Sequence, residues 1–122
     1  MPNFKNNRTA EDLRREIAAI VRELKDPRVR ETLITVMRVE TASDLSYAKV
    51  FVSSMQGLDG AKTAVEGLKS ASGFIRRELS ARLHIRKSPE LKFIADDSVR
   101  ESIEMFEKLK KSGKKETDDD EN

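Results

Sequence analysis

A run of small residues, Ser70-Ala71-Ser72-Gly73, interrupts a stretch that otherwise has the apolar spacing of a helix on both sides. Glycine inside a helix costs about 1 kcal/mol relative to alanine, so such a break usually has a packing or functional reason. A helix that begins at the break would present backbone N–H groups and the positive end of its dipole to an anion. Arg76 and Arg77 follow within one turn. Together these features could bind a phosphate backbone.

The same residues also allow a plainer interpretation. Gly73 could end the first helix and Ser72 or Ser70 could cap the second, which would give a helical hairpin without a ligand. The charge of the surrounding chain favours a ligand. Residues 68–92 contain seven basic side chains and two acidic ones, although the whole chain has a net charge of only +2. Such a local excess is expected of a polyanion-binding surface, and an ordinary solvated helix surface is the alternative.

Residues for catalysis or metal binding are scarce. The chain has no cysteine and one histidine, His84, which falls near a predicted helix end, so we expect it to be a surface or capping residue. Asp96-Asp97 precede a predicted helix, where acids suit the dipole, and Asp118-Asp119-Asp120 lack a fixed geometry for Mg²⁺. No glycine-rich nucleotide-binding loop occurs. We predict a binding protein rather than an enzyme, with no cofactor, metal or small-molecule substrate.

The composition indicates one small domain with a highly charged surface. The chain has 122 residues, of which 38% are charged and 37% hydrophobic. No apolar run approaches membrane-spanning length, and the N-terminus lacks the apolar segment of a secretion signal. The absence of cysteine excludes disulfides. We therefore expect a cytoplasmic protein that does not bind membranes.

The N-terminal quarter predicts one helix. Residues 1–8 are typical of a flexible basic arm, and Thr9 has the sequence context of an N-cap. Apolar residues at helical spacing predict an amphipathic helix over residues 10–25. Asp26-Pro27 ends it, because the residue before proline avoids the helical region.

The middle of the chain predicts a β-hairpin followed by two helices. Residues 32–40 and 46–53 are apolar and β-branched, and a short polar connection joins them. On the second strand, Ala48, Val50 and Val52 should line one face and the alternate residues the other. Asp59 is the predicted N-cap of a helix that runs to about Leu68. After the break, a second helix runs to about His84, with arginines opposite its apolar side.

The last third predicts a strand, a helix and a tail. Leu91–Ile94 is predicted to be a third short strand, and Ser98 with Glu101 forms a capping box. Residues 112–122 are acidic and have nothing apolar to bury, which predicts disorder. The order α-β-β-α-kink-α-β-α predicts an α+β domain over residues 9–111, with a three-stranded sheet and helices on one face. We expect a monomer because the core uses every apolar stripe, including that of the last helix, Val99, Ile103, Phe106 and Leu109.

Four strings carry a resemblance to a known family. They are Asp26-Pro27-Arg28-Val29, the hairpin residues 44–53, Ala71-Ser72-Gly73-Phe74-Ile75-Arg76, and residues 83–93. In this order, and over about Arg8 to Leu109, the chain resembles ribosome-binding factor A, a family of bacterial ribosome-assembly factors.

The resemblance implies a KH domain of the second topological type (type II), in which Ala71-Ser72-Gly73 replaces the usual Gly-x-x-Gly loop. It implies a factor that is not an enzyme, needs no cofactor and associates with the free small (30S) ribosomal subunit. It also implies support of late 16S rRNA maturation, including the 5′ end, and importance at low temperature. Nothing in it extends to the acidic tail.

The resemblance and the charge pattern together predict an RNA-binding site at the break. KH domains clamp about four nucleotides of backbone, and a loop with one glycine is less free to adopt positive φ. The alternative function is a protein-interaction adaptor whose basic face binds an acidic partner. The residues predicted to bind RNA at and around the break are Lys69, Ser70, Ala71, Ser72, Gly73, Arg76, Arg77, Arg82, Arg86 and Lys87. A second contact is predicted on the N-terminal arm and the first helix, at Arg8, Arg14 and Arg15.

Overall fold

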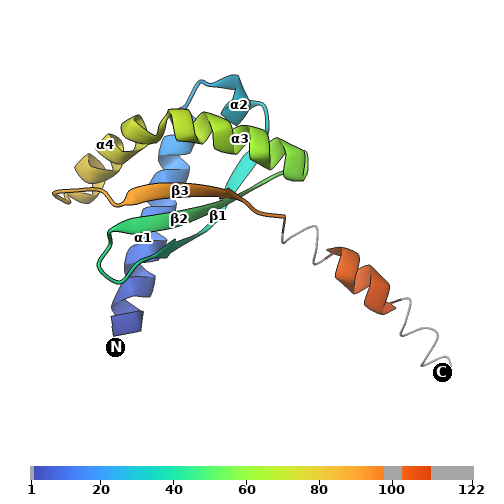
Figure 1. Ribbon diagram of the computed structural model, residues 1–122, viewed down its shortest axis with the longest axis horizontal. Helices are drawn as coiled ribbons and strands as arrows, with labels where there is room; N and C mark the ends of the chain where they lie inside the picture. The colour runs from blue at the N-terminus through green and yellow to red at the C-terminus, as the bar shows by residue number, and fades with distance from the viewer. Residues whose placement is uncertain (1, 98–102, 111–122) are drawn as a thin grey trace.

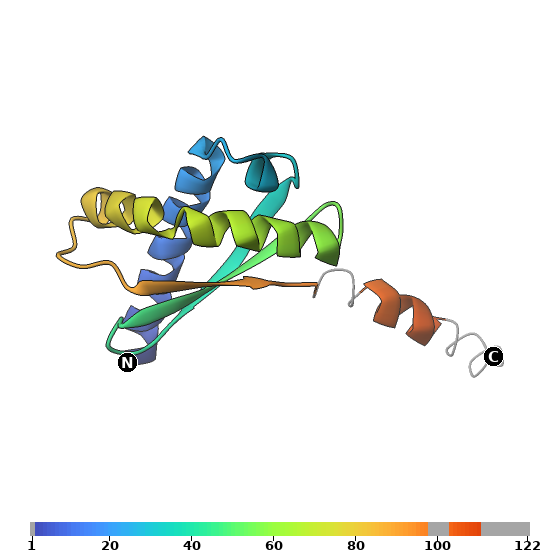
Figure 2. The same cartoon turned by 45° about the horizontal axis from the view of Figure 1, so that its top comes forward.

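The computed structural model describes residues 2–97 and 103–110, with side chains from residue 9 onward. Three helices cover one face of a three-stranded sheet (Figure 1). Figure 2 shows the two helices drawn in green and yellow above the strands, while the first helix, in blue, crosses behind the sheet. We call the opposite face of the sheet, on which none of these three helices packs, the uncovered face. The predicted α+β class is therefore confirmed. Within the described residues, no helix is both long enough and apolar enough to cross a membrane.

The first helix, α1, spans Pro2–Glu23. The N-cap predicted at Thr9 is therefore wrong, and residues 2–8 are helical where a flexible arm was expected. Proline fits the first turn of a helix, and nothing between it and Asp26 breaks the helix. The buried stripe of α1 includes Leu13, Ile17 and Ile20, which are almost completely buried.

The strands form as predicted. β1 (Ile34–Thr41) pairs antiparallel with β2 (Tyr47–Ser54), and β3 (Glu90–Ala95) pairs parallel with β2, so the strand order is β1-β2-β3. Alternation along the central strand determines which face is covered. The side chains of β2 that face the helices are completely buried; they are Ala48, Val50 and Val52.

Two further helices follow the hairpin. α3 spans Leu58–Ser70 and α4 spans Ser72–Leu83. The N-cap of α3 is Gly57, whose φ of 88° favours glycine, so the cap predicted at Asp59 is wrong and that carboxylate lies in the first turn. His84 is the left-handed C-cap of α4, with a φ of 55°, and this confirms its predicted capping role.

The break between the helices lies at Ala71 rather than at the glycine. The Ala71 N–H bonds the carbonyls of Gly67 and Leu68, both at 3.1 Å, and the residue packs against the core. Its φ of −91° is open to any residue, so the kink itself needs no glycine. Ile75, in the first turn of α4, is completely buried, as predicted.

Residues 103–110 form a helix whose side chains are exposed. The capping box at Ser98 and Glu101, together with Val99, lies outside the described residues, as does the acidic tail. The other members of the predicted stripe, Ile103, Phe106 and Leu109, are 55%, 67% and 64% exposed. The expectation that the core uses this stripe is therefore wrong, because α1, α3 and α4 already cover the sheet. The monomeric state stays a prediction, but the argument that no apolar stripe is left exposed no longer supports it.

Candidate nucleic-acid interface

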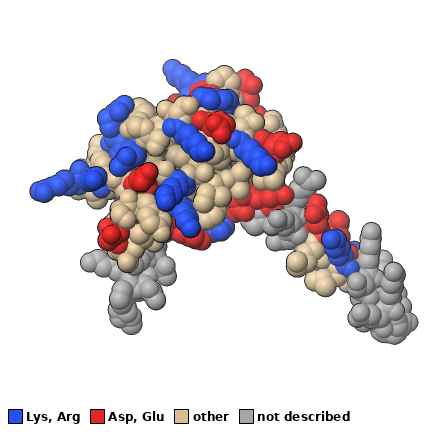
Figure 3. All heavy atoms as spheres, viewed as in Figure 1, with Lys and Arg blue, Asp and Glu red and all other residues tan. Residues whose placement is uncertain are grey.

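A hollow with basic walls lies between α4 and the loop that leads to β3. Its volume is about 440 Å³. Figure 3 shows Lys and Arg side chains gathered over this end of the molecule, where α4 lies in Figure 1. We call this feature the basic hollow. The residues that line it are Gly73, Arg76, Arg77, Ser80, Arg86, Lys87 and Ser88.

Arg76 ties the two walls of the basic hollow together. Its Nη2 donates a hydrogen bond to the Ser88 carbonyl oxygen at 3.1 Å, and Ser88 is buried. The Arg76 Nε is also buried and has no hydrogen-bond partner among the described residues. This contact holds the loop against α4, and the loop places Arg86 and Lys87 opposite the helix. Arg76 is thus mainly a positioning residue, whereas Arg77, Arg86 and Lys87 are exposed.

Gly73 lies in the first turn of α4 beside Arg77. A Cβ built at Gly73 would meet, among the described residues, only the Arg77 Nη1 at 3.7 Å, an ordinary contact distance. Its φ is not in the left-handed region. Glycine here destabilises a helix without a conformational or packing reason inside the fold. The absence of a side chain leaves room for a molecule to approach the backbone of this turn closely.

Arg28 lies on the other side of the break and is not among the site residues predicted from the sequence. It belongs to α2 (Pro27–Arg30), whose N-cap Asp26 accepts a bond from the Arg28 N–H at 2.9 Å. The Arg28 Nη2 donates to the Asp26 carboxylate at 2.7 Å and to the Ser70 hydroxyl at 3.2 Å. The Asp-Pro-Arg-Val string was the available signal. The role of Arg28 could not be inferred from periodicity, because a helix of four residues makes about one turn and shows no repeat.

The residues at and just before the break differ in exposure. Lys69 and Ser70 are exposed at the end of α3, while Ala71 and Ser72 are half-buried. These residues lie between Arg28 and the basic hollow along the chain. Arg28 contacts Ser70 at one end of the break, and Gly73 at the other end lines the basic hollow.

The structure does not bring Arg82 to the hollow. Its Nη2 lies 2.9 Å from the Glu23 carboxylate and 3.2 Å from that of Glu78, so it joins α4 to α1. These bonds raise the pKa of Arg82, with Glu23 as the largest cause. An arginine held by two carboxylates is poorly suited to bind a phosphate.

The predicted second contact on α1 is also separate from the hollow. Arg14 lies 2.6 Å from Glu11, and Arg15 pairs with Asp12, both within one turn. Neither arginine lines the basic hollow. The side chains that the structure describes begin at Thr9, so they do not include that of Arg8.

The pH dependence of stability should report on the α2 cap. The Arg28 guanidinium, followed by its backbone N–H, lowers the pKa of Asp26. A carboxyl with a lowered pKa stabilises the fold above its ordinary value of about 3.9, and this contribution is lost as the pH falls through the folded pKa. Asparagine keeps the N-cap acceptor without the charge. We expect Asp26→Asn to lower the urea midpoint at neutral pH and to match the parent at acid pH. A constant difference at every pH would contradict this.

Comparison with known proteins shows the family of the chain. The family model described as ribosome-binding factor A matches residues 5–109. The chain belongs to the ribosome-binding factor A family. A ribosome-binding factor A from Treponema denticola is 46% identical over 89% of this chain and 83% of its own length. The factor from Caldanaerobacter subterraneus subsp. tengcongensis is 38% identical over 95% of both chains.

Solved structures of ribosome-binding factor A have the same KH-like fold. The crystal structure of the Thermus thermophilus factor has a TM-score of 0.65 and 28% identity, and it covers 74% of this chain and 93% of that one. The solution structure of the Thermotoga maritima protein has a TM-score of 0.68 and 29% identity, covering 77% and 89%. Ribosome-binding factor A is not an enzyme family, in agreement with the prediction.

Proposed function

We propose that this chain is a ribosome assembly factor that binds the free 30S subunit by contacting its rRNA with the basic hollow and the break. In this proposal it supports late 16S rRNA maturation, including that of the 5′ end, and works in the cytoplasm as a monomer. A Thermus thermophilus ribosome-binding factor A, 29% identical with a TM-score of 0.58 over 70% of this chain and 88% of that one, has been fitted into a map of a 30S complex.

The observation that carries the proposal is Gly73 beside exposed cationic side chains. Without a Cβ, RNA phosphates can approach the first turn of α4, where the helix dipole favours negative charge. Arg77, Arg86 and Lys87 then contact neighbouring phosphates, and charge-assisted bonds of this kind are among the strongest that side chains form. The factor acts by occupancy: it holds an immature rRNA arrangement until it is released, and it breaks no covalent bond.

A graded series at Gly73 tests the proposal. We expect Gly73→Ala to weaken binding to purified 30S subunits by about tenfold, equivalent to about 1.4 kcal/mol, and Gly73→Leu to weaken it further. The thermal midpoint should stay unchanged or rise, because the helix loses a glycine. Co-sedimentation on sucrose gradients, with calorimetry beside it, measures both quantities.

Ala81→Leu is the matched control. Ala81 is exposed on the same helix and does not line the basic hollow. It should tolerate the larger side chain without loss of binding. If the Gly73 variants sediment with 30S subunits as the parent does, RNA does not approach this turn. Migration of the parent with a different complex would favour the acidic-partner adaptor.

A further inference from the structure

Two lysines face each other on the uncovered side of the sheet. Lys49 of β2 and Lys92 of β3 are directly paired in the parallel register. Within the described residues, no ion pair involves either lysine. On the other side of Lys49 lies Glu40, whose carboxylate bonds the Arg38 Nε at 3.0 Å. Like charges directly opposite in a sheet are destabilising, so the pairing of the two lysines with each other does not stabilise the fold.

An aromatic ring lies beside the paired lysines. The Lys92 Nζ is 4.6 Å from the centre of the Tyr47 ring, and the ring is half-buried on the uncovered face. Glu90 of β3 is paired in register with Tyr47. A ring with cations nearby is an arrangement that binds unpaired nucleotides, because bases stack on the ring and phosphates contact the cations.

A second ring on the same face is organised differently. Phe51 lies under the Arg38 guanidinium, 3.9 Å from the ring centre. Carboxylates hold that guanidinium in place: Glu40 at 3.0 Å and Asp96 at 3.1 Å. These bonds keep the Phe51 ring covered, whereas no carboxylate of the described residues forms an ion pair that holds Lys92 over Tyr47. The two rings therefore form a natural comparison.

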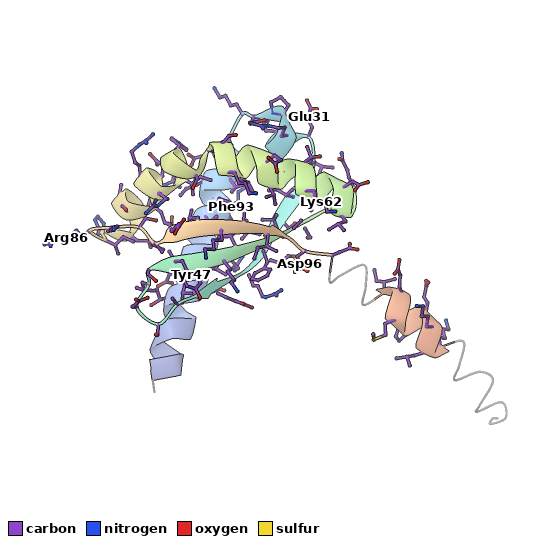
Figure 4. The ribbon with its side chains drawn as sticks, in the orientation of Figure 1. Glu31, Tyr47, Lys62, Arg86, Phe93 and Asp96 are labelled. Atoms are coloured by element: carbon purple, nitrogen blue, oxygen red, sulfur yellow. The ribbon has the colours of Figure 1, made fainter. Side chains whose placement is uncertain are left out.

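The Tyr47 end of the sheet adjoins the basic hollow. The loop with Arg86 and Lys87 leads through buried Ser88 into β3, and the Glu90 N–H bonds the Ser46 carbonyl at 3.0 Å. Figure 4 shows Arg86 at the tip of this loop and Tyr47 on the strand at the same end of the molecule. Cations thus lie on both sides of this end of the molecule, in the hollow and on the uncovered face, with Glu90 between them.

We propose that the uncovered face of the sheet binds an unpaired stretch of RNA, with a base stacked on Tyr47 and phosphates held by Lys49 and Lys92. The inference rests on the proposed function and extends it, since it adds a second surface and specifies single-stranded RNA there. The strand would pass from the basic hollow over Arg86 and Lys87 to reach the sheet.

Tyrosine fluorescence tests the stacking directly. Tyr47 is the only tyrosine of the chain, which has no tryptophan. We expect an unstructured oligouridylate to quench the tyrosine emission of the full-length protein, because a stacked base quenches the ring. A duplex RNA of the same length should bind without this quenching. Absence of quenching at oligouridylate concentrations that saturate anisotropy, or equal quenching by the duplex, would overturn the proposal.

Variants separate the sheet surface from the basic hollow. Tyr47→Phe should keep the anisotropy-measured affinity for labelled oligouridylate, and Tyr47→Leu should weaken it by about tenfold, within the range known for base–aromatic stacking. Phe51→Leu is the control and should not weaken it. Lys49→Gln should lower the salt dependence of binding by about 0.7 in the log–log slope without loss of thermal stability.

The outcomes distinguish the two proposals. If Tyr47→Leu and Lys49→Gln bind RNA as the parent does while Gly73→Leu does not, the sheet surface is refuted and the proposed function stands. If Tyr47→Leu weakens binding only in proportion to lost thermal stability, as a structural role of the ring requires, the sheet surface is also refuted.

Discussion

Charge reversal at both walls of the basic hollow, Arg77→Glu with Lys87→Glu, should remove the association with 30S subunits. Both side chains are exposed, one on α4 and one on the facing loop. A hydrogen bond to a charged group contributes about 1.5–3 kcal/mol, so losing two predicts at least a hundredfold weaker binding. The slope of log affinity against log salt should flatten by about 0.7–0.9 for each lost phosphate contact. Filter binding or sedimentation across a salt series measures both effects.

The matched control changes the net charge equally but outside the site. Lys25→Glu with Lys62→Glu alters two exposed lysines that do not line the hollow, and Figure 4 labels Lys62 on α3. This variant should keep most of the affinity, because only long-range attraction is reduced. Equal losses in the two double variants would show that net charge, rather than the hollow, governs binding.

Gly60→Ala should destabilise the fold more than any other glycine-to-alanine change in α3 or α4. A Cβ at Gly60 would lie 2.6 Å from the Ser54 Oγ and 2.8 Å from the Gln56 Cβ. The Ser54 hydroxyl cannot easily move, because it bonds the Thr32 carbonyl oxygen and accepts from the Gln56 N–H at 2.9 Å. Overpacking costs about 1–3 kcal/mol, which lowers Tm by roughly 10 °C in a domain of this size.

The other two glycines of these helices provide the comparison. A Cβ at Gly67 would lie 2.8 Å from the Val29 Cγ2 and 3.1 Å from the Arg28 Cβ, so Gly67→Ala should also lower Tm by pushing α2 away from α3. Gly73→Ala should not lower it. Thermal unfolding of the three variants therefore has an expected order, and a loss at Gly73 equal to that at Gly60 would contradict our account of why Gly73 is glycine.

Sequence patterns predicted the elements that are long enough to repeat their apolar spacing several times. They missed the elements that depend on single contacts. The strands and the stripe of α1 extend over enough residues for their periodicity to show. α2 has only four residues, and its existence depends on the Asp26 carboxylate and on the missing Cβ at Gly67. The cap at Gly57, in place of Asp59, depends on a positive φ that the loop imposes.

In the candidate site, too, residues near one another in sequence could be predicted, whereas contacts between distant residues could not. Gly73, Arg76, Arg77, Arg86 and Lys87 are near in sequence, and the structure brings them together. Local charge could not show that Arg82 is held by Glu23, because 59 residues separate the two. Nor could it show that Arg28 reaches Ser70, 42 residues away. Which cations stay available to a ligand depends on tertiary contacts.

The bond between Arg76 and Ser88 has a kinetic consequence. Because it fastens the loop to α4 before any ligand arrives, the facing cations would need little ordering to bind the proposed RNA, and preorganisation of this kind lowers the entropic cost of association. The encounter should then proceed at a rate governed by diffusion and by the ionic atmosphere rather than by rearrangement of the protein. Stopped-flow association rates that fall steeply with added salt, yet stay first order in RNA at high concentration, would show a surface that is ready on first contact.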